Sequence, residues 1–187
     1  ANAALGWLRS NYPGRNMLKQ RILTAIILLP IVVALILYAP TTWLAVALTV
    51  VMSLAAYEWS ALAGYTGHTL RIRYVLVTLL ICGGFYMGGR YAGWEIVLWS
   101  LAVLAVVWWF SILVWLAFWR GRMPRALKAV CGWVTLIPSL FASVALADAR
   151  PALLLWLFCI IWSADIGAYF AGKACGRHKL APEISPG

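Results

Sequence analysis

Six long stretches without a charged residue recur along this chain, and they constrain its fold more than any other feature. A helix needs about 20 apolar residues, within a range of roughly 17–25, to cross the hydrocarbon core of a bilayer. Five of the stretches reach this length once two of them are continued past an isolated acid, Glu58 in the second and Asp165 in the last. The weakest candidate is the third, which is short and contains Gly83 and Gly84. The six stretches are residues 22–38, 41–57, 74–89, 96–119, 129–147 and 152–164.

The amino-acid composition agrees with a membrane protein and excludes two other classes. Of the 187 residues, 65% are hydrophobic and 11% are charged, whereas a soluble domain averages about 45–50% apolar and about 25% charged residues. A soluble globular domain and a disordered chain are therefore excluded. Apolar runs of this length are typical of membrane helices rather than of barrel strands. We predict an all-α, polytopic integral membrane protein with about six transmembrane helices.

The distribution of charge supports this number of spans and gives an orientation. The chain has 15 Lys and Arg residues against 5 Asp and Glu residues, and the basic residues lie between the apolar stretches. With six spans, 13 of the 15 basic residues fall on one side of the membrane. Because cytoplasmic loops of membrane proteins are enriched in Lys and Arg, we expect both chain ends to be cytoplasmic. The charge excess is thus explained by topology, and we predict no nucleic-acid partner.

Three segments follow from these patterns. Residues 1–16 differ in character from the rest, and we interpret them as a leader or an extension before Met17. Residues 17–172 are expected to form the transmembrane helical domain. Residues 173–187 are expected to form a basic cytoplasmic loop.

The last apolar stretch carries the strongest candidate for a functional site. An ionised carboxylate such as Asp165 is costly inside a membrane unless it is paired, binds a metal or reaches water. At 100° per residue, Asp165, Tyr169, Gly172 and Lys173 fall on one helix face. The loop that follows contains further polar residues, among them Arg177, Lys179 and Ser185. An acid that can hold Mg²⁺, next to basic residues, suits a nucleotide or phospholipid phosphate. A structural salt bridge of Asp165 is the alternative.

Other polar residues have simpler interpretations. Glu58 is expected to reach water or to pair with a basic loop residue, rather than to act in a site. His68 is interpreted as a solvated loop histidine, and Gly83-Gly84 as a point of close helix packing. The basic segment 120–128 is interpreted as a topology signal, with attraction of anionic lipid headgroups as the second possibility.

Residues 165–187 resemble a known family of enzymes. The string D-x-x-A-Y-x-x-G-K-x-x-G-R-H-K-L-A-P-E-I-S-P-G is similar to the corresponding region of phosphatidate cytidylyltransferases, also called CDP-diacylglycerol synthases. Near the start, Met17-Leu-Lys-Gln-Arg-Ile, Pro30 and Ala-Ala-Tyr57-Glu58-Trp59 also resemble bacterial members. The resemblance extends from Met17 to Gly187.

This resemblance implies an enzyme of the bacterial inner membrane with its active face in the cytoplasm. Family members join CTP and phosphatidic acid to give CDP-diacylglycerol and diphosphate, with Mg²⁺. The resemblance implies that Asp165 is catalytic and holds the metal. It also implies that a set of neighbouring residues binds substrate. These are Tyr169, Lys173, Arg177, Lys179 and Ser185. Faces rich in Gly and Ala would permit a homodimer.

The family pattern continues beyond the last residues of this sequence. Family members carry Lys-Thr, an acidic Glu-Gly and further helices with more acidic residues after Ser-Pro-Gly. The chain thus resembles the N-terminal two-thirds of such an enzyme, and we expect it to be inactive alone.

Three other functions stay open at this point. A CDP-alcohol phosphotransferase would also act on CDP-lipids, but Ile166 and Tyr169 depart from its signature. A CTP-dependent polyprenol or phytol kinase would share much of the chemistry. A small membrane transporter would use Asp165 as an ion-coupling residue.

Overall fold

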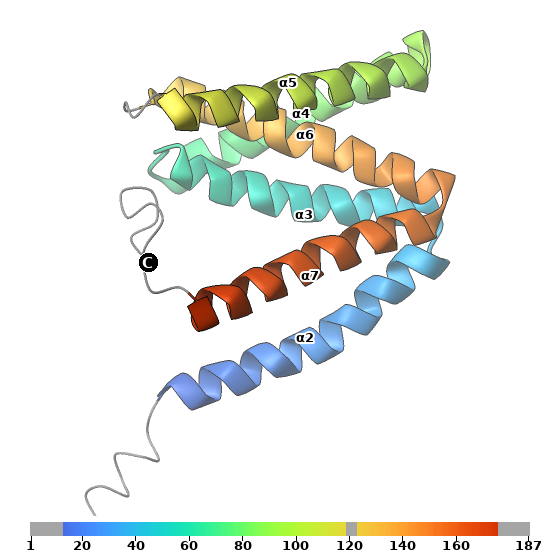
Figure 1. Ribbon diagram of the computed structural model, residues 1–187. Coiled ribbons are helices and arrows are strands. Elements are labelled where there is room, and N and C mark those ends of the chain that lie inside the picture. Colours follow the sequence, from blue (N-terminus) through green and yellow to red (C-terminus); the bar gives the residue numbers. More distant parts are fainter. Residues whose placement is uncertain (1–12, 119–122, 176–187) are drawn as a thin grey trace, which may run out of the picture. The chain divides into compact units, whose positions relative to one another are not determined.

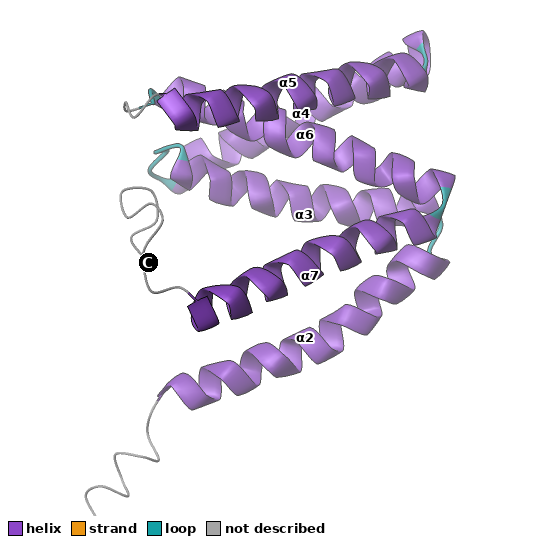
Figure 2. Cartoon of the chain, in the orientation of Figure 1, coloured by secondary structure: helices purple, strands orange, loops and turns teal. Residues whose placement is uncertain are grey.

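The computed structural model describes residues 13–118 and 123–175, and in these ranges the chain is helical without strands (Figures 1 and 2). The six helices are α2 (Pro13–Tyr38), α3 (Thr41–Leu62), α4 (His68–Ala92), α5 (Trp94–Phe118), α6 (Arg125–Ala149) and α7 (Pro151–Cys175). Five of them, α3 to α7, are long and apolar enough to cross a membrane, and α2 contains a shorter apolar stretch, Ile26–Tyr38. The prediction of an all-α, polytopic membrane protein is confirmed.

The helices belong to two compact units. Unit 1 contains α2 and α7, which pack against each other. Unit 2, Pro40–Arg150, contains α3 to α6. Within unit 2, α3 contacts α4 and α6, and α5 contacts the same two helices. The expected domain boundaries at residues 16/17 and 172/173 fall inside α2 and α7.

Short turns separate the helices, and proline and glycine mark them. Pro40 and Pro124 precede α3 and α6, where their fixed φ angle is compatible with a helix start. Gly67, before α4, has φ +96°, and Gly93, between α4 and α5, has φ +103°. L-residues with a side chain rarely adopt these angles, so glycine permits both turns. The third apolar stretch is the central part of α4, a helix of 25 residues. The stretch looked short because hydropathy does not detect the polar ends of this helix.

The helices of unit 2 alternate in direction, so α3 and α5 end at the same side of the unit at which α4 and α6 begin (Figure 1). Basic side chains gather there, and we call this side the basic end of unit 2. Its described basic residues are His68, Arg71, Arg73, Arg125 and Lys128.

Two clusters of buried side chains hold unit 2 together. One contains Met52, Cys82 and Leu101 near the middle of the helices. The other contains Ala56, Tyr74 and Ala129 and lies next to the basic end. The first cluster joins all four helices of the unit, and the second joins α3, α4 and α6.

The predicted close packing at Gly83-Gly84 is wrong. Both glycines are exposed, and a Cβ atom added to either would have no atom within 4 Å. Close packing occurs instead at Gly132 in α6, where an added Cβ would collide with the Tyr74 hydroxyl and the Trp59 indole. A glycine pair allows a close approach but does not specify a partner, and on α4 no neighbouring helix comes close to this pair.

Candidate functional site

Three of the predicted site residues lie on α7. Asp165, Tyr169 and Lys173 are four residues apart and so share a face of this helix, and all three are exposed. Gly172 has open space beside it, since an added Cβ would meet no atom within 4 Å. Within the described ranges Asp165 forms no ion pair, and the alternative of a structural salt bridge stays open.

The other predicted site residues, Arg177, Lys179 and Ser185, lie outside the described residues. The structure therefore brings together an acid, a phenol and an amine on α7. Their roles in binding and catalysis stay predictions.

Metal binding was predicted for Asp165. Among residues 13–118 and 123–175, no three His, Cys, Asp or Glu side chains lie close enough together to hold a metal ion. Mg²⁺, however, is often bound through one or two carboxylates together with substrate phosphates. A single exposed carboxylate, Asp165, fits that kind of site, in which substrate phosphates supply the other ligands.

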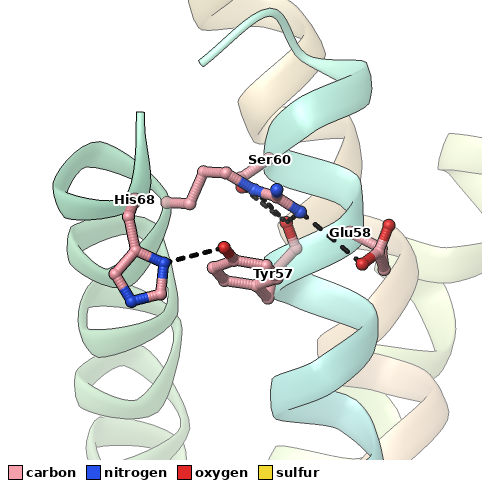
Figure 3. A network of polar contacts seen from close by, with 5 residues as sticks. Tyr57, Glu58, Ser60 and His68 are labelled. Atoms are coloured by element: carbon pink, nitrogen blue, oxygen red, sulfur yellow. Dashed lines mark hydrogen bonds and ion pairs between the residues drawn. The ribbon is translucent and has the colours of Figure 1, made fainter. Parts of the chain in front are cut away.

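A second group of polar residues forms a network of contacts at the basic end of unit 2 (Figure 3). The sequence did not predict this network. The guanidinium of Arg71, in α4, lies 3.6 Å from the centre of the Tyr57 ring in α3. Its Nε and Nη2 atoms donate hydrogen bonds to the Tyr57 carbonyl oxygen, at 3.2 and 3.0 Å. The same oxygen accepts a 2.6 Å hydrogen bond from Ser60 Oγ. Arg71 thus fastens the end of α3 to the start of α4.

Glu58 and His68 complete this network (Figure 3). The Glu58 side chain is 78% exposed and its Oε1 lies 3.6 Å from Arg71 Nη2, so the predicted pairing with a basic residue occurs, although Arg71 belongs to α4 and not to a loop. His68 is exposed, as expected, but it is the first residue of α4 and not part of a loop. Its Nδ1 atom lies 2.9 Å from the Tyr57 hydroxyl. The loop prediction failed because the left-handed turn at Gly67 lets the helix begin at once.

The start of α6 is joined to the same end of unit 2. Tyr74 Oη donates a 2.9 Å hydrogen bond to the Ala129 carbonyl oxygen, and Trp59 Nε1 donates one of 2.8 Å to the Lys128 carbonyl oxygen. The Tyr74 ring also stacks on Trp133, with the ring centres 5.4 Å apart. These contacts connect residues more than 50 positions apart in the sequence, so no local pattern could reveal them.

The two groups differ in the chemistry available to them. The Arg71 guanidinium already contacts a ring, a carbonyl oxygen and a carboxylate, and this network serves to fix α3 against α4. The exposed Asp165 and Lys173 of α7 can contact a ligand. The α7 face is therefore the better candidate for a reactive site.

Comparison with known proteins gives a consistent result. Residues 19–187 match the model of a family described as the cytidylyltransferase family. A phosphatidate cytidylyltransferase of Pseudomonas aeruginosa is 36% identical over 180 residues, which cover 91% of this chain and 63% of that protein. One of Haemophilus influenzae is 34% identical over 194 residues, covering 91% of this chain and 66% of that protein. This chain thus spans a little under two thirds of the length of these relatives. No solved structure matches it.

Proposed function

This chain belongs to the cytidylyltransferase family, and we propose that the complete protein is a phosphatidate cytidylyltransferase. It would convert CTP and phosphatidic acid to CDP-diacylglycerol and diphosphate. The observation that carries this proposal is the likeness, over 91% of the chain, to two proteins of that name. The exposed acid and amine on one face of α7, a membrane-spanning helix, support it independently.

The proposed reaction transfers a cytidylyl group. A phosphate oxygen of phosphatidic acid attacks the α-phosphorus of CTP, a new P–O bond forms, and the bond to the β-phosphate breaks to release diphosphate. Because both reactants are polyanions, positive charge must reduce their repulsion and stabilise the charge that develops in the transition state. Lys173 would contact the phosphates of CTP, and Tyr169 would help to orient the substrate.

Asp165 is the residue of this chain that would hold Mg²⁺. The ion would neutralise phosphate charge in the site and thereby favour the approach of the two reactants. Arg177, Lys179 and Ser185 would bind the nucleotide from the segment after α7. CTP is a cytoplasmic metabolite, so the site would face the cytoplasm, in agreement with the excess of basic residues expected on that side. The membrane would be the bacterial inner membrane.

Replacing Asp165 by Asn tests this proposal. The substitution keeps the size of the side chain and removes its charge. We expect formation of CDP-diacylglycerol from labelled CTP, in membranes containing the full-length protein, to fall by more than about tenfold, which corresponds to over ~1.4 kcal/mol. Asp148→Asn is the matched control, since Asp148 is an exposed carboxylate at the end of α6, and it should leave the rate unchanged.

Three outcomes would contradict the proposal. Normal activity of Asp165→Asn across a Mg²⁺ titration would show that this carboxylate neither binds the metal nor acts in catalysis. Failure of the unaltered protein to form CDP-diacylglycerol, with transfer of the γ-phosphate of CTP to a polyprenol instead, would show a lipid kinase. Uptake of a solute into proteoliposomes that requires Asp165, without any CTP turnover, would show a transporter.

A further inference from the structure

A cavity of about 370 Å³ lies at the basic end of unit 2, between α3, α5 and α6. This volume is within the range of roughly 300–1,000 Å³ that is common for small-ligand sites. Four tryptophans line the cavity, together with Met123 and Lys128. The tryptophans are Trp59, Trp108, Trp109 and Trp115. The cavity shares no residue with the α7 site.

Two of the four tryptophans that line the cavity use their N–H groups in hydrogen bonds to α6. Trp59 Nε1 donates to the Lys128 carbonyl oxygen at 2.8 Å. Trp108 Nε1 donates to Thr135 Oγ1 at 3.1 Å. Thr135 Oγ1 in turn donates to the Cys131 carbonyl oxygen at 2.8 Å. Hydrogen bonds to α6 thus fix two of the rings, and the carbon surfaces of these rings are left for an apolar ligand.

The charge at the cavity is positive. Lys128 lines it with an exposed side chain, and no lining residue is acidic. Arg125 lies one turn earlier on α6, with its guanidinium 5.7 Å from the centre of the Tyr65 ring. The nearby acid Glu58 lies within 3.6 Å of Arg71 on the α3–α4 side. An anion beside Lys128 would therefore meet a cationic surface.

We propose that this cavity binds one acyl chain of a phospholipid whose anionic phosphate headgroup contacts Lys128. The ends of membrane-spanning helices lie at the depth of lipid headgroups, where tryptophan is enriched and where basic residues attract anionic lipids. At that depth the cavity combines an apolar volume with a cation. An anionic phospholipid matches both features, because its acyl chain fits the apolar volume and its phosphate pairs with the cation. This lipid site is additional to the α7 site, and binding there requires neither CTP nor turnover.

Photolabelling in liposomes tests the site directly. The full-length protein is reconstituted in phosphatidylcholine with a trace of phosphatidylglycerol that carries a diazirine on one acyl chain. Phosphatidylglycerol is chosen because it is anionic and is not a substrate of the proposed transferase reaction. After illumination, labelled peptides are mapped by mass spectrometry. A phosphatidylcholine with the same diazirine-bearing chain serves as the zwitterionic probe.

We expect the anionic probe to label the peptides that contain Trp59 and Trp108–Trp109 about fivefold more than the zwitterionic probe, from the contribution of one basic residue near the membrane surface. Lys128→Gln should lower the labelling by the anionic probe to the level of the zwitterionic one. The Lys128→Gln substitution keeps the backbone carbonyl oxygen that accepts the Trp59 hydrogen bond. An unchanged melting temperature would show that this variant is folded. Arg73→Gln, which removes an exposed charge at the same end of unit 2 but outside the cavity, should change nothing.

A second variant tests the volume rather than the charge. Ile112 lines the cavity from α5, and Ile112→Trp adds an aromatic ring to its wall. Labelling of these peptides by the anionic probe should fall, because the acyl chain loses its space.

Four results would overturn the proposal. Equal labelling by the two probes would show that the cavity takes acyl chains without any headgroup contact. Labelling elsewhere on the protein but not at these peptides would show that another protein segment covers the cavity. Equal losses with Lys128→Gln and Arg73→Gln would mean that the whole basic end attracts anionic lipid diffusely. Labelling that persists in Ile112→Trp would place the acyl chain outside the cavity.

Discussion

The polar side chains of unit 2 and those of α7 are used in different ways. In unit 2, hydrogen bonds join polar side chains of one helix to another helix. Tyr57 of α3 and Arg71 of α4 connect these two helices, and Trp59 of α3 contacts the start of α6. On α7, Asp165, Tyr169 and Lys173 are exposed. Polar groups therefore serve packing in unit 2, whereas we propose that those on α7 bind a ligand. Substitutions in unit 2 should accordingly lower stability, and substitutions on the α7 face should lower turnover.

The largest stability effect is expected at Gly132. Gly132→Ala adds one methyl group where the Tyr74 hydroxyl and the Trp59 indole already lie. Overpacking of this kind typically costs about 1–3 kcal/mol of the free energy of unfolding. Thermal unfolding of the purified protein in detergent, followed by tryptophan fluorescence, should show a melting temperature several degrees lower.

The matched control for this prediction is Gly84→Ala. Gly84 is also inside a helix, but it is exposed and an added Cβ meets no atom within 4 Å. Alanine is a better helix former than glycine by up to about 1 kcal/mol, so this variant should melt at the same or a slightly higher temperature. If both variants melted alike, the close contact at Gly132 would not hold unit 2 together, and the comparison between the two regions would fail.

Within residues 13–118 and 123–175, the number and position of the helices could be predicted from the sequence because the bilayer fixes their length. The stretches at residues 129–147 and 152–164 lie within α6 (Arg125–Ala149) and α7 (Pro151–Cys175). The alignment of Asp165, Tyr169 and Lys173 was predictable for a similar reason, since it needs only a regular helix. Their roles in ligand binding stay predictions.

The packing inside unit 2 could not be predicted in the same way. Trp59 and Lys128 are 69 positions apart, and hydropathy does not indicate which helices become neighbours. For the same reason, no feature of the sequence around Gly132 showed that this glycine is closely packed whereas Gly83 is exposed. Only the pairing of Glu58 was anticipated, because a carboxylate at the end of a membrane helix needs water or a nearby cation.

Arg71→Gln should have an intermediate effect. It removes a guanidinium that donates two hydrogen bonds to the Tyr57 carbonyl oxygen and lies over the Tyr57 ring. Hydrogen bonds from charged donors and contacts of a cation with a ring contribute about 1–3 kcal/mol together in partly exposed sites. We expect a loss near the lower end of that range, because Gln can replace one of the hydrogen bonds.

Arg73→Gln is the control for this substitution as well. Arg73 is two residues further along α4 and its side chain is exposed, so its replacement should leave the melting temperature unchanged. A similar loss in both variants would mean that net positive charge, and not the contacts to Tyr57, stabilises the start of α4.

The smallest effect is expected for Glu58→Gln, and it separates two explanations of the Arg71 network. The Glu58 side chain is 78% exposed and its oxygen lies 3.6 Å from the Arg71 nitrogen, and ion pairs of this kind contribute about 0–1 kcal/mol. The melting temperature of Glu58→Gln should therefore lie close to that of the unaltered protein, and added salt should reduce the difference further because exposed charges are screened. A loss as large as that of Arg71→Gln would show that the carboxylate, rather than the Tyr57 carbonyl oxygen and ring, holds Arg71 in place. An exposed polar group in unit 2 would then be structural, and exposure alone could no longer distinguish the ligand-binding residues of α7 from the packing residues of unit 2.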